Sequence, residues 1–199
     1  MNRQEKGYKS FQIFILICVI QCCGLNSLAQ NGKIEVEVSS KPTAVESRTG
    51  EIFERLVAFR RDIHRHPELG GEEKRTAEKI REYLTSLGLE VKTGIGGHGV
   101  VGILRGGKDG RKIAWRADMD ALASNSRDVV AFQSSNPGVR HICGHDVHVA
   151  IALGIADVLV SLKNQINGTI YFVFQPSEEN VRGAKAMMDD GLFEMIDPE

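Results

Sequence analysis

The stretch "GTIYFVFQ", residues 168–175, is apolar and rich in aromatic and β-branched side chains, without polar alternation. A strand of this kind is buried on both faces, because elements cover the sheet from two sides. An apolar segment of helical length precedes it at 146–164, and another helical pattern follows at 181–196. This order predicts an α/β domain with the stretch as an inner strand of its sheet.

Two further helices are expected nearer the N-terminus. The first covers residues 51–68 and carries apolar side chains at helical spacing, namely Ile52, Leu56, Phe59 and Ile63. Pro67 ends this helix, since proline is incompatible with its continuation. The second helix covers residues 72–88 and stops at Gly88.

Strand patterns occupy residues 89–95, 99–106 and 113–120. The first two suit a hairpin because only Gly-Gly-His separates them. Residues 106–112 are typical of a turn, and residues 122–140 are expected to be irregular. Strands and helices therefore alternate, which predicts an α/β fold with a mixed sheet flanked by helices.

Residues 1–29 have the pattern of a secretory signal peptide. A basic start precedes an apolar stretch at 11–25, and Ser27–Ala29 offers the small residues of a cleavage site. The apolar stretch is shorter than the about 20 residues that a membrane-spanning helix needs. We expect an exported protein, periplasmic or extracellular, with an uncleaved membrane anchor as the alternative.

Residues 30–50 are polar and are predicted to be a flexible linker, which leaves residues 51–199 as one domain. The formal net charge of −1 at pH 7 gives no reason to expect nucleic acid as a partner. Beyond residue 29, Cys143 is the only cysteine, so this part of the chain cannot form an internal disulfide. A single thiol in an oxidising compartment is a liability unless it is buried or bound.

The segment "RHICGHDVH", residues 140–148, holds several groups that bind metals. Cys143 and His145 are two residues apart, so in extended chain their side chains point the same way. Thiolate and imidazole are good ligands for zinc and its first-row neighbours. Asp146 is a candidate N-cap of the following helix. A buried thiol beside a polar turn is the structural alternative.

Acidic residues follow two of the predicted strands. Glu178 and Glu179 come after residues 168–175, and Asp118 and Asp120 share a face at the end of the third strand. Ligands collect at the ends of strands in open α/β sheets. One carboxylate can bind a metal while another takes a proton from water. Solvated loop carboxylates are the alternative. Three predicted strand ends, however, carry acidic or metal-binding residues, namely "RADMD", "CGHD" and "FQPSEE", and together they predict one site.

Two weaker patterns have structural explanations. "GIGGHG", residues 94–99, fits a dinucleotide-binding loop, which needs a helix to follow it. The next residues are strand-like, so a hairpin turn is expected, and a dinucleotide-linked oxidoreductase is ruled out if residues 100–105 form a strand. His64 and His66 lie at a predicted helix end, where surface or capping roles compete with a metal role.

Four segments together resemble a known family: "RRDIHRHPELGGEE", "RADMDALA", "NPGVRHICGHDVH" and "FVFQPSEEN". They are similar to the metal-dependent amidohydrolase branch of the aminoacylase and carboxypeptidase superfamily, with hippurate hydrolase, N-acetyl-diaminopimelate deacetylase and auxin–amino-acid conjugate hydrolases. The resemblance implies a zinc-exopeptidase-like catalytic domain that hydrolyses the amide bond of N-acyl amino acids or small peptides.

The resemblance also implies the cofactors and their ligands. Cys143, His145 and Glu179 match metal-ligand positions for two divalent metal ions, with zinc or manganese expected and cobalt or nickel compatible. The implied partner is a small-molecule substrate, an N-acyl amino acid or a peptide. Under this reading Cys143 is a ligand and not a nucleophile.

The remaining site residues receive roles by the same resemblance. Glu178 matches the general base, which removes a proton from water and returns it to the leaving amine. Asp120 matches an active-site position of the wider superfamily, and His148 is a supporting residue.

Members of this family carry two more histidine ligands and a lid domain that pairs subunits, and these are missing from the sequence. Residues 51–199 are therefore predicted to be the truncated N-terminal part of a catalytic domain, inactive alone, with a homodimer compatible only with the full-length protein. The alternative is a degraded, non-catalytic member that acts as a binding or structural domain. The coding sequence downstream of Glu199 would distinguish them.

Overall fold

The structure is a computed structural model that describes residues 42–198. The predicted signal peptide at 1–29 and the first part of the predicted linker lie outside the described residues. Among the described helices, none combines the length and the apolar character that a transmembrane span requires.

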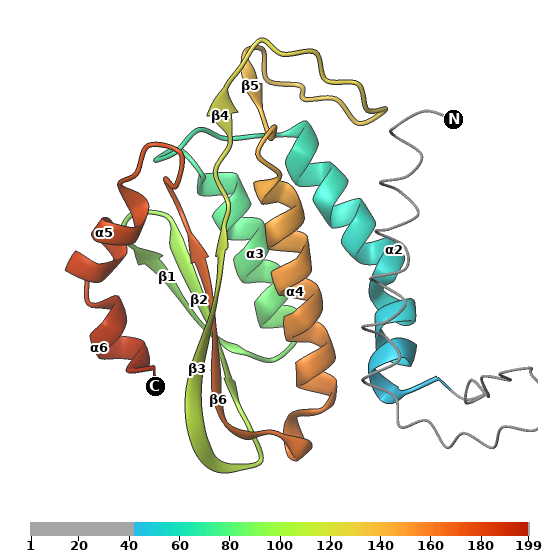
Figure 1. Cartoon of the computed structure of the whole chain (residues 1–199), viewed down its shortest axis with the longest axis vertical. Helices are drawn as coiled ribbons and strands as arrows, with labels where there is room; N and C mark the ends of the chain where they lie inside the picture. The colour runs from blue at the N-terminus through green and yellow to red at the C-terminus, as the bar shows by residue number, and fades with distance from the viewer. Residues whose placement is uncertain (1–41, 199) are drawn as a thin grey trace, which may run out of the picture. The chain divides into compact units, whose positions relative to one another are not determined.

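Four strands form a mixed sheet in the order β1-β2-β6-β3 (Figure 1). Their bounds are Glu90–Ile95 for β1, Gly99–Arg105 for β2, Lys108–Asp118 for β3 and Asn167–Gln175 for β6. β2 is antiparallel to β1 and to β6, whereas β3 is parallel to β6. The predicted hairpin and the mixed character of the sheet are confirmed.

Strand β6 lies inside the sheet and contributes to both hydrophobic cores. Phe172 and Phe174 point into the larger core, and Tyr171 and Val173 point into the smaller one on the opposite face. Successive side chains of a strand face opposite sides, so burial of both faces requires apolar residues at every position. This explains why the stretch at 168–175 shows no polar alternation.

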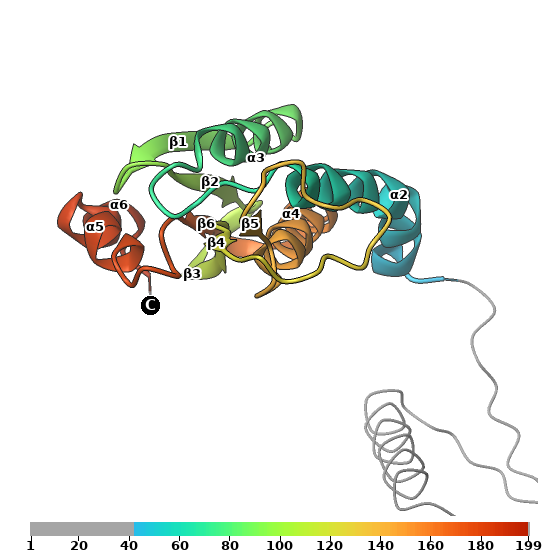
Figure 2. The same cartoon turned by 90° about the horizontal axis from the view of Figure 1, so that it is seen from above.

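Helices cover both faces of the sheet (Figure 2). The larger core is closed by three helices, α2 (Ala44–Arg65), α3 (Lys74–Ser86) and α4 (His145–Ser161). The smaller core is closed by two short helices, α5 (Gly183–Asp189) and α6 (Leu192–Ile196). α2 packs along α4, where Gly154 leaves room for the other helix: a Cβ there would lie 2.8 Å from Leu56 Cδ1.

The predicted linker at 30–50 is wrong for its last part, because α2 begins at Ala44. Thr43 and Glu46 form a capping box there: Glu46 N–H donates to Thr43 Oγ1, and Thr43 N–H donates to the Glu46 carboxylate. This T-x-x-E pattern is a sequence signal of a helix N-terminus. The first turns of α2 are exposed, so the absence of apolar periodicity there concealed the helix.

Two other boundaries differ from the prediction. The expected turn at 106–112 is mostly strand, because β3 already begins at Lys108, which pairs with Asn167. The single helix expected at 181–196 is broken into α5 and α6. Gly191 separates them with φ 83°, a left-handed conformation that a helix cannot contain.

Residues 122–140 were expected to be irregular but include two very short strands. β4 (Leu122–Ala123) and β5 (Val139–Arg140) pair as a separate antiparallel sheet. A 3-10 helix, η1 (Lys163–Gln165), connects α4 to β6.

The glycine-rich segment at 94–99 connects β1 directly to β2, and residues 100–105 belong to β2. No helix follows this loop, so it cannot present a helix N-terminus to a pyrophosphate. The dinucleotide-linked oxidoreductase is therefore excluded.

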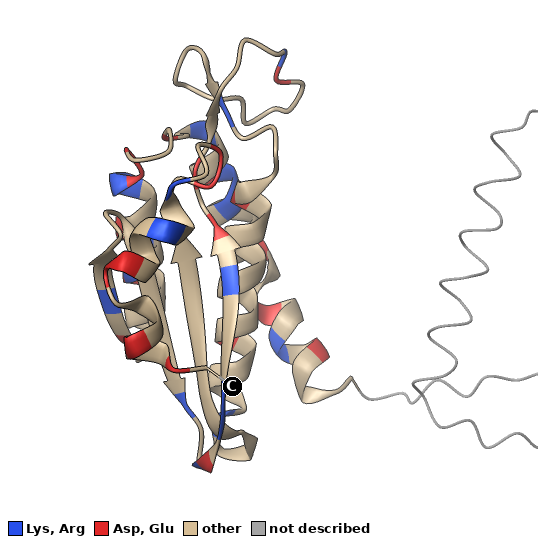
Figure 3. Ribbon diagram, turned by 60° about the vertical axis from the view of Figure 1, so that its left-hand side comes forward, with Lys and Arg blue, Asp and Glu red and all other residues tan. Residues whose placement is uncertain are grey.

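Charged residues of both signs are interspersed over the helices and loops, and the middle of β2 and of β6 carries none (Figure 3). Several exposed residues pair one helical turn apart, such as Lys185 with Asp189. Polar side chains in buried positions are instead concentrated around α4 and at one end of the sheet.

Candidate metal centre

The parallel pairing of β3 and β6 brings their carboxyl ends to the same edge of the sheet, where Asp118 is the partner of Gln175. Asp120 follows β3, and Glu178 and Glu179 follow β6. α4 begins at the same edge with His145. The ends of β3 and β6 and the start of α4, which contain the acidic and metal-binding residues singled out in the sequence, therefore meet in space.

His145 is buried, and its hydrogen bonds fix the state of its ring. Nδ1 lies 2.9 Å from the backbone oxygen of Asp120 and 3.2 Å from its Oδ1. A carbonyl oxygen only accepts, so Nδ1 is the protonated nitrogen and Nε2 carries the lone pair. This second contact is the kind that orients a metal-binding histidine.

Three carboxylates face the free nitrogen of His145. Nε2 lies 3.7 Å from Asp118 Oδ2, 3.7 Å from Glu179 Oε1 and 3.8 Å from Glu178 Oε2. Donor atoms that bind one zinc ion at about 2.1 Å each are separated by about 3–4 Å. The spacing thus suits ligands of a common cation.

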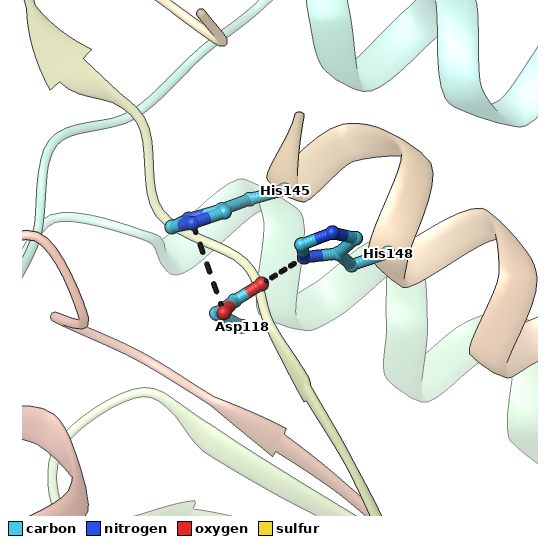
Figure 4. A group of neighbouring side chains, drawn as sticks. All are labelled: Asp118, His145 and His148. Atoms are coloured by element: carbon cyan, nitrogen blue, oxygen red, sulfur yellow. Dashed lines mark hydrogen bonds and ion pairs between the residues drawn. The ribbon is translucent and has the colours of Figure 1, made fainter. Parts of the chain in front are cut away.

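The candidate ligands fall into two groups that share His145. Asp118, His145 and His148 form one, and His145, Glu178 and Glu179 form the other, with ligand atoms within 4.8 Å of one another in each. Figure 4 shows Asp118 directed at both imidazole rings. His148 Nδ1 lies 2.6 Å from Asp118 Oδ1, and the two rings stack with centroids 5.6 Å apart.

Glu179 provides a direct sign that this donor set fits a cation. Its Oε1 is buried and accepts no hydrogen bond from a described residue. A buried polar atom without a partner costs about 1–3 kcal/mol. Because this oxygen points at the lone-pair nitrogen of His145, a cation between them would satisfy both atoms. The residues present therefore fit a divalent metal ion.

Cys143 is exposed, and the structure brings it to Glu179 but into neither group of mutually close ligand atoms. The hydrogen bond to Glu179, with further contributions from burial and nearby carboxylates, raises the pKa of the Cys143 thiol to about 11. A bound cation acts in the opposite direction, since a coordinating thiol is deprotonated.

In the metal-free site, Asp120 and His145 shift each other's pKa in opposite directions. Burial raises the pKa of Asp120, but the hydrogen bond from His145 and backbone amides of Glu179 and Glu178 leave it below its ordinary value. Burial also opposes protonation of His145, yet Asp120 and the charge of Asp118 raise its pKa overall. Asp120 is therefore a fixed anion at the base of the site.

The prediction of Asp146 as the helix N-cap is wrong. Gly144 occupies that position with φ 85°, and Asp146 lies in the first turn of α4, fully buried. Its Oδ2 accepts from Arg60 Nε at 2.7 Å and lies 2.9 Å from His64 Nδ1. Asp146 therefore ties the start of α4 to α2.

The two histidines at the end of α2 lie outside both ligand groups. His64 is buried between Asp146 and Asp128. His66 is the C-cap residue, and its Nδ1 lies 2.9 Å from the backbone oxygen of Asp62. The capping role considered for the pair is confirmed for His66 alone, whereas His64 has neither a surface nor a capping position but a buried one between two carboxylates.

Asp118 is a site residue to which the sequence reasoning gave no role. Only the two-residue spacing to Asp120 indicated that both carboxylates face the same way. That spacing does not reveal the partners, because His148 and His145 come from α4.

A mixed sheet with imidazole, carboxylate and thiol groups at one edge defines an α/β domain with a candidate metal centre. Its residues 114–199 match the model of peptidase family M20/M25/M40. The structure is similar to the YXEP protein of Bacillus subtilis, described as a dinuclear metal-binding peptidase from the M20 family. The TM-score is 0.69 with 37% identity, over 72% of this chain and 41% of that one.

Curated relatives agree with this match. Thermostable carboxypeptidase 2 of Saccharolobus solfataricus is 45% identical over 150 residues, 74% of this chain and 38% of the relative. Hippurate hydrolase of Campylobacter jejuni is 43% identical over 147 residues, 74% and 37% of the two chains. The chain belongs to the M20/M25/M40 peptidase family, and it spans about two fifths of the length of these relatives.

Proposed function

We propose that this protein is a metal-dependent amidohydrolase that cleaves the amide bond of N-acyl amino acids or small peptides. The observation that carries the proposal is the state of His145, with Nδ1 committed to Asp120 and Nε2 facing the carboxylates of Glu178 and Glu179. Hippurate hydrolase and the carboxypeptidase among the relatives are named for reactions of this class.

The proposed ligands of the divalent ions are Cys143, His145 and Glu179, with Asp118 and His148 beside them. Zinc or manganese is the expected metal, and cobalt or nickel is compatible, because thiolate and imidazole suit zinc while carboxylates accept the others. When bound, such ions supply Lewis acidity and lower the pKa of water towards about 7.

Glu178 is the proposed general base. Its carboxylate is 40% exposed, so it can reach water and a bound substrate, and its Oε2 faces the same nitrogen as Glu179 Oε1. It takes the proton of the attacking water and delivers it to the nitrogen of the leaving amine. Asp120 supports this arrangement, because it holds both the ring of His145 and the backbone amide of Glu179.

Export is part of the proposal, on the ground of the signal-peptide pattern at residues 1–29. Small acylated amino acids or peptides outside the cytoplasm are then the expected substrates.

The test is hydrolysis of N-benzoylglycine and N-acetyl amino acids by the full-length protein, with zinc or manganese added. We expect amine release that chelation abolishes and metal restores. Glu178→Gln should lower kcat by about 100-fold or more, as expected for loss of a general base, while metal stays bound. Glu194→Gln, an exposed glutamate of α6, is the matched control.

Two results would count against the proposal. Metal binding without hydrolysis of any of these substrates favours the non-catalytic alternative. Hydrolysis that survives both chelation and Glu178→Gln would place the chemistry elsewhere.

A further inference from the structure

Glu73 is a buried carboxylate outside both groups of candidate ligands. It has 0% exposed surface, and burial raises its pKa. Glu73 is the N-cap residue of α3, yet its side chain makes no capping hydrogen bond. Glu68 serves that helix instead, since its carboxylate accepts from the backbone amides of Arg75 and Thr76. Helix capping therefore does not explain why a carboxyl group is buried at Glu73.

The carboxylate of Glu73 joins two loops. Its Oε2 accepts from Gly71 N at 2.8 Å, and its Oε1 accepts from Ser177 N at 2.6 Å. Ser177 has φ 54°, a left-handed conformation that is unfavourable for a residue with a side chain. Such a conformation persists only where surrounding contacts hold it. The contact with Glu73 is one that holds it.

A second carboxylate holds the next part of the same loop. Asp120 Oδ2 accepts from Glu179 N at 3.0 Å. Glu178 therefore lies between two anchored amides, those of Ser177 and Glu179. Loss of either anchor would let the loop leave its strained conformation and turn both glutamates away from His145.

We propose that Glu73 is a positioning residue: through the Ser177 amide it keeps the 177–179 segment in the conformation that directs Glu178 and Glu179 at His145. The inference rests on the proposed function, which assigns the chemistry to these two glutamates. Glu73 acts through the backbone and makes no hydrogen bond to a candidate ligand side chain.

The test compares Glu73→Gln with Glu72→Gln in the full chain. Both substitutions turn a carboxyl group into an amide of the same size, but Glu72 is exposed. Glutamine at 73 keeps the size of the side chain and turns one acceptor into a donor, so one of the two anchored amides loses its partner. Zinc affinity is measured by calorimetry, and backbone amide hydrogen exchange of residues 177–179 is measured in a chelator.

We expect Glu73→Gln to weaken zinc binding about 10–100-fold, the usual effect of removing a partner that orients ligands. Exchange at Glu178 and Glu179 should accelerate about tenfold or more, because the loop opens locally. Glu72→Gln should change neither quantity. Glu73→Asp, which keeps the charge but is one methylene shorter, provides a second variant if the amide variant folds poorly, with an intermediate effect.

Acceleration confined to the Ser177 amide, or zinc affinity within about threefold of wild type for Glu73→Gln and Glu73→Asp, would overturn the inference. A loss of stability without a change in zinc affinity would show that Glu73 is only structural. Failure of the proposed function has a different signature, namely a wild-type protein that binds no zinc or hydrolyses no amide. The exchange measurement needs no metal, so it judges Glu73 in either case.

Discussion

Helix α4 carries two buried aspartates about three turns apart, and their surroundings differ. Asp157 is 1% exposed, and both its oxygens have partners: Arg48 donates to Oδ1, and Arg55 and Tyr83 donate to Oδ2. Asp146 is 0% exposed, but its contacts with α2 all involve Oδ2, and Oδ1 has no partner among the described residues.

Other buried polar atoms of the described residues share the condition of Asp146 Oδ1. Both ring nitrogens of His141 and Oε1 of Glu179 lack partners, and so do Nη1 of Arg75 and Nε of Arg140. Native proteins satisfy most buried polar groups, and the exceptions call for an explanation. The Asp157 cluster has the saturated contacts of a structural ion pair. Among the unsatisfied atoms, Oε1 of Glu179 belongs to a candidate ligand group, where a bound cation would give it a partner.

The largest effect is expected at the candidate centre, from His145→Ala. His145 belongs to both ligand groups. Loss of a residue that only orients a ligand weakens metal binding by up to about 100-fold, so loss of His145 itself should weaken zinc binding by more than that. Calorimetric titration with zinc measures this. His98→Ala, in the turn between β1 and β2, is the control. Equal zinc affinity of the two variants would remove the basis of the contrast between the clusters.

The second effect belongs to the other cluster, with Asp157→Ala. Arg48 and Arg55 are 34% and 49% exposed and can regain water, so the loss should stay below the about 3–5 kcal/mol of a fully buried pair. We expect the free energy of unfolding to fall by about 2–3 kcal/mol in urea titrations, with zinc affinity unchanged. Asp109→Ala, an exposed aspartate of β3, is the control. A large drop in zinc affinity would show that the clusters are not independent.

The third effect is a pH dependence from His141, measured without metal. Burial lowers the pKa of His141 to about 4, against an ordinary value of 6.5. The unfolded chain takes up this proton first, so the contribution to stability is complete above pH 6.5 and is lost as the pH falls through about 4. At pH 5 the loss is on the order of 2 kcal/mol.

His141→Leu removes this titration and keeps an apolar side chain in the buried position. Urea unfolding at pH 7.5 and pH 5 should then show a smaller loss of stability in the variant than in the wild type. Identical losses in both proteins would mean that His141 is protonated in the folded state at pH 5.

The smallest effect is expected where the ionic contact is fully on the surface. Lys185 and Asp189 are 74% and 61% exposed, so Lys185→Ala should change the free energy of unfolding by no more than about 0.5 kcal/mol. Urea titrations at low and high salt check this. A loss of unfolding free energy as large as that of Asp157→Ala would mean that burial does not decide how much an ion pair stabilises this protein.

Patterns of neighbouring residues in the sequence predicted most of the helices and strands. The apolar run of β6 and the short connection of the hairpin each carry their own signal. The T-x-x-E sequence at Thr43 was also available, but the exposed start of α2 offered no apolar period to draw attention to it. The break at Gly191 lies inside a continuous helical pattern, so its left-handed conformation could not be read from period alone.

The candidate centre was predictable as a meeting of strand ends, because parallel strands bring their carboxyl ends together. Its internal contacts were not. Glu73 reaches Ser177 across 104 residues, and Asp118 reaches His148 across 30. Such contacts depend on how α3 and α4 pack on the sheet. The residues around Glu73 and Asp118 in the sequence do not indicate which partner either side chain will contact. The exposure of Cys143 was equally hidden.

The strand order β1-β2-β6-β3 has a consequence for synthesis on the ribosome. Of the described strands β6 is made last, yet it is the one that joins the β1–β2 hairpin to β3. Until residue 175 has left the exit tunnel, the earlier strands have no common neighbour, and their apolar faces stay open to chaperones or to aggregation. The sheet can close only once nearly all of the described chain has been translated.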